Sequence, residues 1–104
     1  MRTVTKFLFV AALGAALPLY AANAGNPAAG KLVYDTNCSN CHGPDGTPVL
    51  QGAPNFTKGE RMEKPDAQLL VSMNNGLNIM PAWKGVLTDV QMADALAFAR
   101  TLRK

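Results

Sequence analysis

The clearest pattern of apolar residues lies near the C-terminus of the chain. There, apolar side chains recur three or four positions apart, which is the spacing of one face of an α-helix. The residues concerned are Met92, Ala95, Leu96, Ala99 and Leu102. Thr88 and Gln91 stand just before them with the spacing of a capping box. The pattern therefore predicts a C-terminal helix that begins after Thr88.

A first helix is predicted over residues 27–38. Asn26 can cap it, and Pro27 suits its first turn, where the missing N–H leaves no partner unsatisfied. Its apolar surface comes from Ala28, Leu32 and Tyr34.

A second helix is predicted over residues 65–75. Pro65 suits its first position and Gly76 can end it, while Leu69, Leu70 and Met73 form an apolar stripe. No stretch alternates apolar and polar residues well enough to predict a strand. The expected fold class is therefore all-α.

Between these helices lie two stretches without a sustained period, residues 43–64 and 77–87. The first holds four Gly and three Pro. A loop of about 20 residues is unusual in a compact domain, but it is reasonable where it wraps a large ligand. A domain this small often needs a cofactor or another staple for stability.

Residues 1–24 have the pattern of a secretory signal peptide. Arg2 and Lys6 precede an apolar run over residues 7–19, and Ala22 and Ala24 provide small residues for a peptidase. The run has 13 residues, whereas a membrane span needs roughly 20. We expect cleavage after Ala24, with residues 25–104 as the mature domain and no stable membrane insertion afterwards.

Charge and composition exclude several classes of function. The 104-residue chain has a net charge of +3, but residues 25–104 hold eight basic and seven acidic side chains, which leaves +1. This balance gives no reason to expect binding to nucleic acid. Two Cys and one His are too few for a disulfide scaffold or for a metal site made of four Cys and His ligands.

The segment that predicts chemistry is Cys38-Ser39-Asn40-Cys41-His42, a C-x-x-C-H motif of the kind that attaches c-type haem. Two thiols one helical turn apart can add to the two vinyl groups on one edge of a porphyrin, and His42 can then reach the iron. A redox-active dithiol and a zinc site remain alternatives. The first normally accompanies a βαβ pattern, and the second needs a further carboxylate ligand.

Methionine is the expected second ligand of the iron, because His42 is the only histidine. Met80 is the preferred candidate, since it lies in a loop that Pro81 stiffens, with Trp83 nearby. Met73 and Met92 have helical spacing and are expected in the core. Met62 lies in a charged stretch and is expected to be exposed.

Taken together, these motifs resemble the class I monohaem c-type cytochromes, in particular small bacterial ones. The resemblance covers residues 27–103 and includes the motifs in their expected order. These are Gly30-x-x-x-Tyr34-x-x-x-Cys38, C-x-x-C-H followed by Gly43, Pro54-Asn55-Phe56, Asn78-Ile79-Met80-Pro81-Ala82-Trp83, and a terminal helix with Phe98.

The resemblance implies a role for each residue of the site. Cys38 and Cys41 would form the thioethers to one haem c per chain. His42 would be the proximal iron ligand and Met80 the distal one. The carbonyl of Pro54 would accept a hydrogen bond from the other ring nitrogen of His42. Trp83 is expected to line the haem pocket.

The resemblance also implies a small cytochrome c fold, with N- and C-terminal helices packed together around the haem. Gly30 and Tyr34 would pack against the terminal helix near Phe98. Ala95 stands where the family often has a larger aliphatic residue. The crossing of the two helices is therefore expected to be closer or less well filled.

The function implied is that of a periplasmic one-electron carrier without an open catalytic site. Its partners would be redox proteins, such as a reductase, a dehydrogenase or a terminal oxidase, and the protein would be a monomer. Two alternatives stay open. One is a haem subunit or accessory protein of a larger reductase or oxidase, and the other is a ligand-binding haem protein with a displaceable Met.

Overall fold

The computed structural model describes residues 25–104. Its elements in chain order are the helices α3 (Pro27–Asn37) and α4 (Ser39–His42), the 3₁₀ helix η2 (Phe56–Lys58), and the helices α5 (Asp66–Asn75) and α6 (Asp89–Arg100). Extended pairing in this part of the chain is limited to two isolated bridges. The prediction of an all-α fold is confirmed.

The predicted signal peptide, residues 1–24, and its cleavage site lie outside the described residues. Within residues 25–104, none of the helices has the length and apolar character that crossing a bilayer requires.

The helix ends follow the capping residues. The side chain of Asn26 accepts hydrogen bonds from the N–H groups of Ala28 and Ala29. Thr88 and Gln91 make both hydrogen bonds of a capping box. Three boundaries differ from the prediction. Cys38 is the C-cap of α3 rather than its last residue. Pro65 is the N-cap of α5 rather than its first residue, and α6 ends at Arg100, so Leu102 lies beyond the helix.

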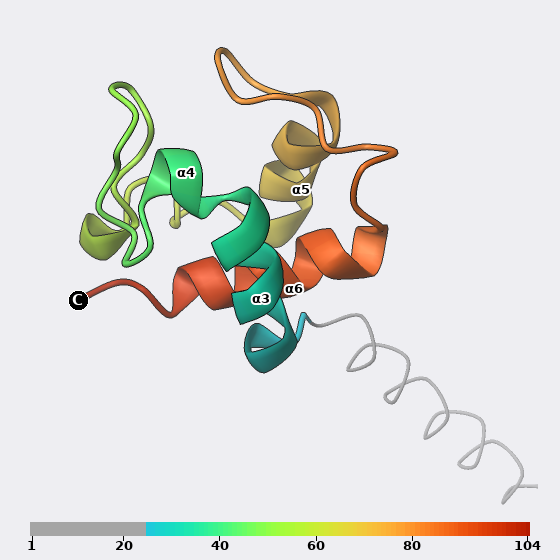
Figure 1. Cartoon of the computed structure of the whole chain (residues 1–104), viewed down its shortest axis with the longest axis horizontal. Coiled ribbons are helices and arrows are strands. Elements are labelled where there is room, and N and C mark those ends of the chain that lie inside the picture. Colours follow the sequence, from blue (N-terminus) through green and yellow to red (C-terminus); the bar gives the residue numbers. More distant parts are fainter. Residues whose placement is uncertain (1–24) are drawn as a thin grey trace, which may run out of the picture.

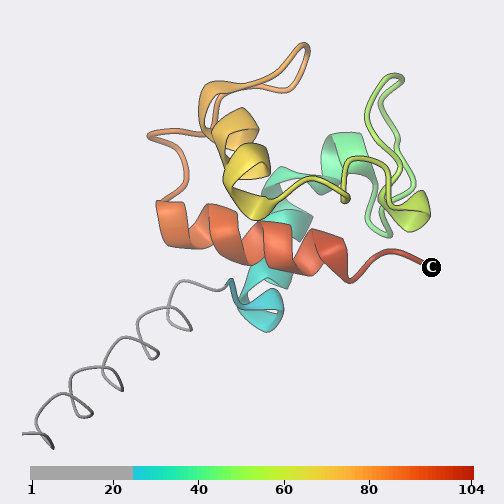
Figure 2. The same cartoon turned by 180° about the vertical axis from the view of Figure 1, so that it is seen from behind.

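Helices α3 and α6 cross at short range, and both views show α3 lying across α6 (Figures 1 and 2). A Cβ at Gly30 would lie only 1.8 Å from the carbonyl oxygen of Asp94. Ala95, on the adjoining turn, is 2% exposed. The two backbones therefore approach each other closely at this crossing, with Ala95 buried in it.

The core connects this crossing to the C-x-x-C-H motif. Tyr34, Phe56 and Ala99 form a buried cluster, and the partly buried side chains packed against it are Cys38, Met62, Phe98 and Leu102. The rings of Tyr34 and Phe98 have centroids 5.2 Å apart. The Tyr34 hydroxyl donates a buried hydrogen bond of 2.6 Å to the carbonyl of Gly43, next to His42.

Arg100 joins the end of α6 to the segment before α5. Its guanidinium donates to the carbonyl oxygens of Met62 and Lys64 and to the carboxylate of Asp66, each at 2.8 Å. It also contacts the Met62 sulfur at 3.8 Å. The expectation that Met62 is exposed is therefore wrong, because these contacts and the aromatic cluster hold it half-buried.

The predicted loop over residues 43–64 is ordered by its own hydrogen bonds. The N–H groups of Val49 and Leu50 both donate to the carbonyl of Cys41, and η2 forms within the segment. At the C-terminus, the N–H of Lys104 donates to the carbonyl of Thr57 at 2.9 Å. The tip of this loop, drawn in light green, and the loop after α5 project away from α6 (Figure 1), whereas η2 lies close to the C-terminus.

Candidate haem site

The two cysteines and the histidine lie on one helical turn. The N–H of Cys38 donates to the carbonyl of Tyr34 at 2.8 Å, which continues the path of α3. The N–H groups of Cys41 and His42 then donate to the carbonyl of Cys38 at 3.2 and 3.0 Å. Both thiols are free and half-buried. The motif therefore presents two sulfur atoms and an imidazole from a single rigid segment.

Burial raises the pKa of the Cys38 thiol to about 11, and the neighbouring Cys41 adds to this shift. The thiol is consequently protonated at neutral pH. Reactive dithiol centres need the thiolate, which usually comes from a lowered pKa. Cys38 therefore lacks the lowered pKa that is typical of the reactive cysteine of a dithiol centre.

His42 is placed against Phe56, with ring centroids 4.5 Å apart and nearly parallel planes. Burial lowers the pKa of His42, and the nearby carbonyl of Pro54 acts in the opposite direction. Nδ1 of His42 is buried, and none of the atoms in residues 25–104 meets the geometry of a hydrogen bond to it. A neutral imidazole is the form that binds a metal.

Met80 lies in a tight turn after α5. Its N–H donates to the carbonyl of Leu77 at 3.0 Å, and the N–H of Leu77 donates back at 3.1 Å. Gly76 has φ of 81° and lets the Met80 carbonyl lie close to its Cα. A Cβ at this position would be only 2.9 Å from the Met80 carbonyl oxygen. The far end of this segment is fixed by the backbone N–H of Trp83, which donates to the carbonyl of Met73 at 2.8 Å.

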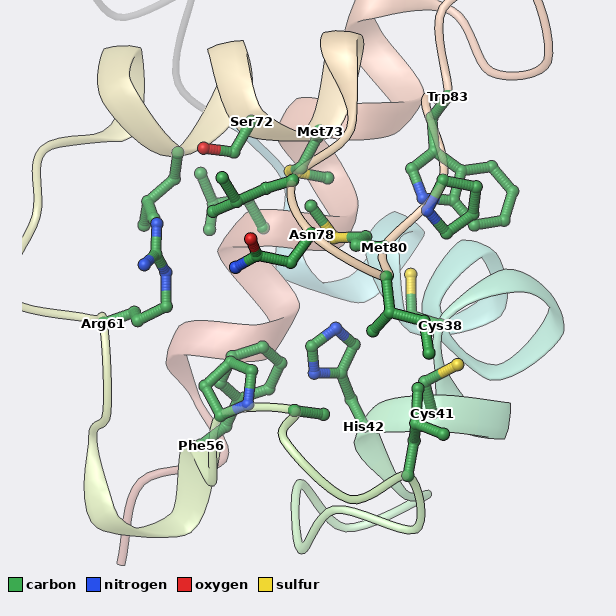
Figure 3. Close-up of a pocket in the computed structure, with 18 of the residues that line it drawn as sticks. Cys38, Cys41, His42, Phe56, Arg61, Ser72, Met73, Asn78, Met80 and Trp83 are labelled. Carbon is green, nitrogen blue, oxygen red and sulfur yellow. The ribbon is translucent and has the colours of Figure 1, made fainter.

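A cavity of about 200 Å³ brings the six predicted residues together: it is lined by Cys38, Cys41, His42, Pro54, Met80 and Trp83 among others. Figure 3 shows one ring nitrogen of His42 directed toward the side of the cavity on which Met80 lies. Cys38 and Cys41 stand beside them at one edge (Figure 3). Residues separated by some forty positions in the chain thus face a common space.

The cavity also has lining residues that the sequence analysis did not place there. Met73, which was expected in the core, is half-buried and faces the cavity instead. Met62 and Met73 bring the number of methionines in its wall to three. Arg61 and Asn78 add polar groups. No signal in the sequence distinguishes Arg61 from a solvated charge, because its neighbours Glu60 and Glu63 are also charged.

These residues fit a covalently bound haem. Two thiols, a half-buried imidazole whose buried Nδ1 has no hydrogen-bonding partner among residues 25–104, and a thioether face one cavity with mostly apolar walls. When bound, the group would be held by the two sulfurs of the motif, with the imidazole and a thioether available to its iron.

Comparison with known proteins decides the family. The model of the family described as "Cytochrome C oxidase, cbb3-type, subunit III" matches residues 25–98. The chain is 33% identical over 100 residues to cytochrome c6 of Thermosynechococcus vestitus (strain NIES-2133 / IAM M-273 / BP-1). That match covers 89% of this chain and 88% of the relative. The chain belongs to the class I monohaem c-type cytochromes.

Other c-type cytochromes agree with this assignment. The fold matches the c-type cytochrome KustC0563 with a TM-score of 0.66 and 27% identity, over 72% of this chain and 98% of the other. It matches cytochrome c6 of the diatom Phaeodactylum tricornutum with a TM-score of 0.63 and 25% identity, over 74% and 93% of the two chains. The predicted small cytochrome c fold is confirmed.

One further relative is a subunit of an oxidase. The chain is 34% identical over 90 residues to the cbb3-type cytochrome c oxidase subunit CcoP of Azospirillum sp. (strain B510). The match covers 79% of this chain but only 30% of that subunit. As a c-type cytochrome, the chain carries covalent haem c and transfers electrons with redox partners, either as a separate carrier or as part of an oxidase.

Proposed function

We propose that this cytochrome is a soluble, monomeric one-electron carrier of the periplasm, in which His42 and Met80 would bind the haem iron. The observation that supports this most directly is the cavity itself, where the imidazole and the Met80 loop face each other beside Cys38 and Cys41. Haem supplies an iron that exchanges one electron. Because His42 and Met80 would both bind the iron, we expect no open site for a substrate.

The protein side of this site has three tasks. The two thioethers prevent loss of the cofactor when the chain opens. The thioether of Met80 and the apolar cavity favour the reduced, less charged iron, and so raise the reduction potential. The carbonyl of Pro54 is the proposed acceptor for Nδ1–H of His42, and such a contact would set the tautomer and the basicity of the ligand.

Export accounts for the N-terminal segment. We propose that residues 1–24 are removed after Ala24, which leaves residues 25–104 in the periplasm. The intact mass of purified protein tests this step. We expect the mass of residues 25–104 plus one haem. A mass that also includes residues 1–24 would show that the segment is retained.

The ligands are tested by the absorption spectrum of the purified protein. We expect a low-spin, six-coordinate haem that does not bind CO at neutral pH. A high-spin spectrum, or rapid binding of CO, would instead support the alternative in which Met80 is absent from the iron or easily displaced. Colourless protein would overturn the proposed site altogether.

A second candidate function is that of a haem subunit of an oxidase. The family model and the 34% identity to CcoP favour it. Fractionation of cells that produce the full chain separates the two functions. A carrier is recovered alone and monomeric from the soluble periplasm, whereas a subunit is recovered with its complex in the membrane fraction.

A further inference from the structure

The backbone of Gly25 lies directly on helix α6. A Cβ at Gly25 would be only 2.1 Å from the carbonyl oxygen of Ala93 and 3.0 Å from the Cβ of Ala97. Figure 2 shows this part of the chain, drawn in cyan, beside α6. Glycine therefore lets the backbone at position 25 reach the surface of α6, and a larger residue would hold it away.

Asp94 binds the backbone next to Gly25. Its Oδ1 accepts a hydrogen bond of 2.8 Å from the N–H of Asn26, which lies sixty-eight residues earlier in the chain. Asp94 is half-buried and directly follows Ala93 on α6. Because these contacts fix both the carboxylate and the backbone of residues 25–26, they also fix the surroundings of the Gly25 nitrogen.

Backbone geometry limits how far the Gly25 nitrogen can lie from these groups on α6. The nitrogen is one bond from the Cα of Gly25, so it lies within about 5 Å of the Ala93 carbonyl oxygen. It precedes the nitrogen of Asn26 by one residue, which keeps it within about 6.5 Å of Asp94 Oδ1. A positive charge on this nitrogen would therefore be attracted directly by the carboxylate.

Asp94 forms no ion pair with another side chain of residues 25–104. The same holds for Asp89, which is exposed one turn before Ala93 on α6. The carboxylate next to Gly25 is therefore free to receive a positive charge. The other charged residues of the two helices that meet at Gly25 are engaged in ion pairs, Lys31 with Asp35 and Arg100 with Asp66.

We propose that Asp94 binds the α-ammonium group that cleavage after Ala24 creates at Gly25, and that this ion pair holds the mature N-terminus on α6. The proposal rests on the proposed removal of residues 1–24. Hydrolysis of the peptide bond between Ala24 and Gly25 consumes one water and leaves a carboxylate on Ala24 and an ammonium group on Gly25. The ordinary pKa of an α-amine is about 7.7–8.0, so most of these groups are charged at neutral pH.

The ion pair would exist only in the processed chain. Before cleavage, the nitrogen of Gly25 belongs to an uncharged amide, which cannot form an ion pair with a carboxylate. Cleavage after Gly25 would remove the residue that lies on Ala93, and cleavage at an earlier bond would place the charge on a residue ahead of Gly25. The position of the cut therefore decides whether the crossing of α3 and α6 gains this interaction.

The proton-binding constant of the α-amine in the mature holoprotein tests the proposal. The pH dependence of acetylation by acetic anhydride, followed on the N-terminal peptide by mass spectrometry, gives this constant. Asp94→Asn removes the charge but keeps an oxygen that can accept from the N–H of Asn26. Glu63→Gln is the control, because it removes an exposed carboxylate near the other end of α6, where Arg100 binds the carbonyl of Lys64.

We expect the constant to be about two- to fivefold higher in the wild type than in Asp94→Asn, which is the range of a single ion pair near the protein surface. Glu63→Gln should retain the wild-type constant. High salt should lower the wild-type constant toward that of Asp94→Asn, because dissolved ions screen the pair. Equal constants in the wild type and Asp94→Asn, or equal decreases in both variants, would overturn the proposal.

The wild-type protein decides alone if Asp94→Asn does not mature. Its α-amine should then bind the proton more tightly in the native holoprotein than in the same chain unfolded in urea. An equal or weaker constant in the native protein would overturn the proposal.

The intact mass of the same samples keeps this test separate from that of the proposed function. A mass that shows cleavage at another bond, or no cleavage, would refute the proposed export step and the ion pair together. A mass that fits residues 25–104 with one haem, together with an α-amine that does not respond to Asp94→Asn, would refute only the ion pair.

Discussion

At the scale of single residues, three methionine side chains share the wall of the haem cavity. Met62 is held by Arg100 and the aromatic cluster, and Met73 lies on α5. Met80 lies in a loop outside the helices and is half-buried. Met92, which belongs to the core, is 1% exposed. The packing thus supports Met80 as the sulfur that is available to a cofactor.

Substitution of each methionine in the cavity wall tests this choice. Met80→Ala should lower the reduction potential and open the iron to CO or cyanide, because it removes the thioether ligand. Met73→Ala should mainly destabilise the protein, by about 2–3 kcal/mol, because it shortens a packed side chain. Potentiometry and ligand titration measure the first effect, and urea unfolding measures the second.

Met62→Ala is the matched control for this pair, since Met62 also lines the cavity. It should leave the spectrum six-coordinate. If Met62→Ala or Met73→Ala opened the iron while Met80→Ala did not, the wrong sulfur would have been assigned.

The hydroxyl of Tyr34 gives a second prediction at the residue scale. Tyr34→Phe removes its buried hydrogen bond to the carbonyl of Gly43, and should lower the free energy of unfolding by about 1–2 kcal/mol at neutral pH. Burial raises the pKa of Tyr34 above its ordinary value of 10.0. The stability that this group contributes is therefore present below pH 10.0 and is lost as the pH rises beyond it.

Urea unfolding of both proteins at neutral pH and at about pH 11 checks this expectation. The difference in stability between wild type and Tyr34→Phe should shrink at the higher pH. Tyr34 is the only tyrosine of the proposed mature domain, so the comparison isolates one hydroxyl. A difference that stays constant with pH would contradict the assigned cause.

At the scale of elements, the close crossing of α3 and α6 holds the domain together. Gly30→Ala tests it. Ala is favoured over Gly in a helix by about 1 kcal/mol, but the added Cβ would lie 1.8 Å from a backbone oxygen of α6. The cost of the steric clash is larger than the gain in helix propensity, because the backbones of α3 and α6 must move apart to make room for the Cβ. We expect a net loss of about 3 kcal/mol or more in unfolding free energy.

Gly85→Ala is the control for this substitution. Gly85 has φ of 84°, but a Cβ there would meet no atom within 4 Å. Its cost should be limited to backbone strain of about 1–2 kcal/mol. Equal costs for the two substitutions, measured by urea unfolding of the holoprotein, would show that the crossing is not closely packed.

At the scale of the whole molecule, the near balance of charges limits steering by long-range electrostatics. With +1 on residues 25–104, we expect the rate of electron transfer with the physiological partner to fall less than about tenfold between 10 and 150 mM ionic strength. Stopped-flow kinetics with the purified partner measures this change. A steeper fall would mean that clustered charges guide docking.

Local interactions explain which parts of this protein the sequence determined by itself. The helices follow from apolar periodicity, and their ends follow from side chains such as Asn26 and Thr88 that bind backbone groups a few residues away. The C-x-x-C-H motif is also local, since one helical turn places both thiols. The family, the all-α fold and the haem cofactor could therefore be predicted.

Only the tertiary structure decided what surrounds the motif. It withdrew Met62 from solvent through contacts with Arg100, which lies thirty-eight residues later. It also brought Arg61 and Asn78, which both have positive φ angles, to the wall of the cavity. Such placements depend on long-range packing and on positive φ angles in loops, and neither leaves a periodic or motif signal in the amino-acid sequence.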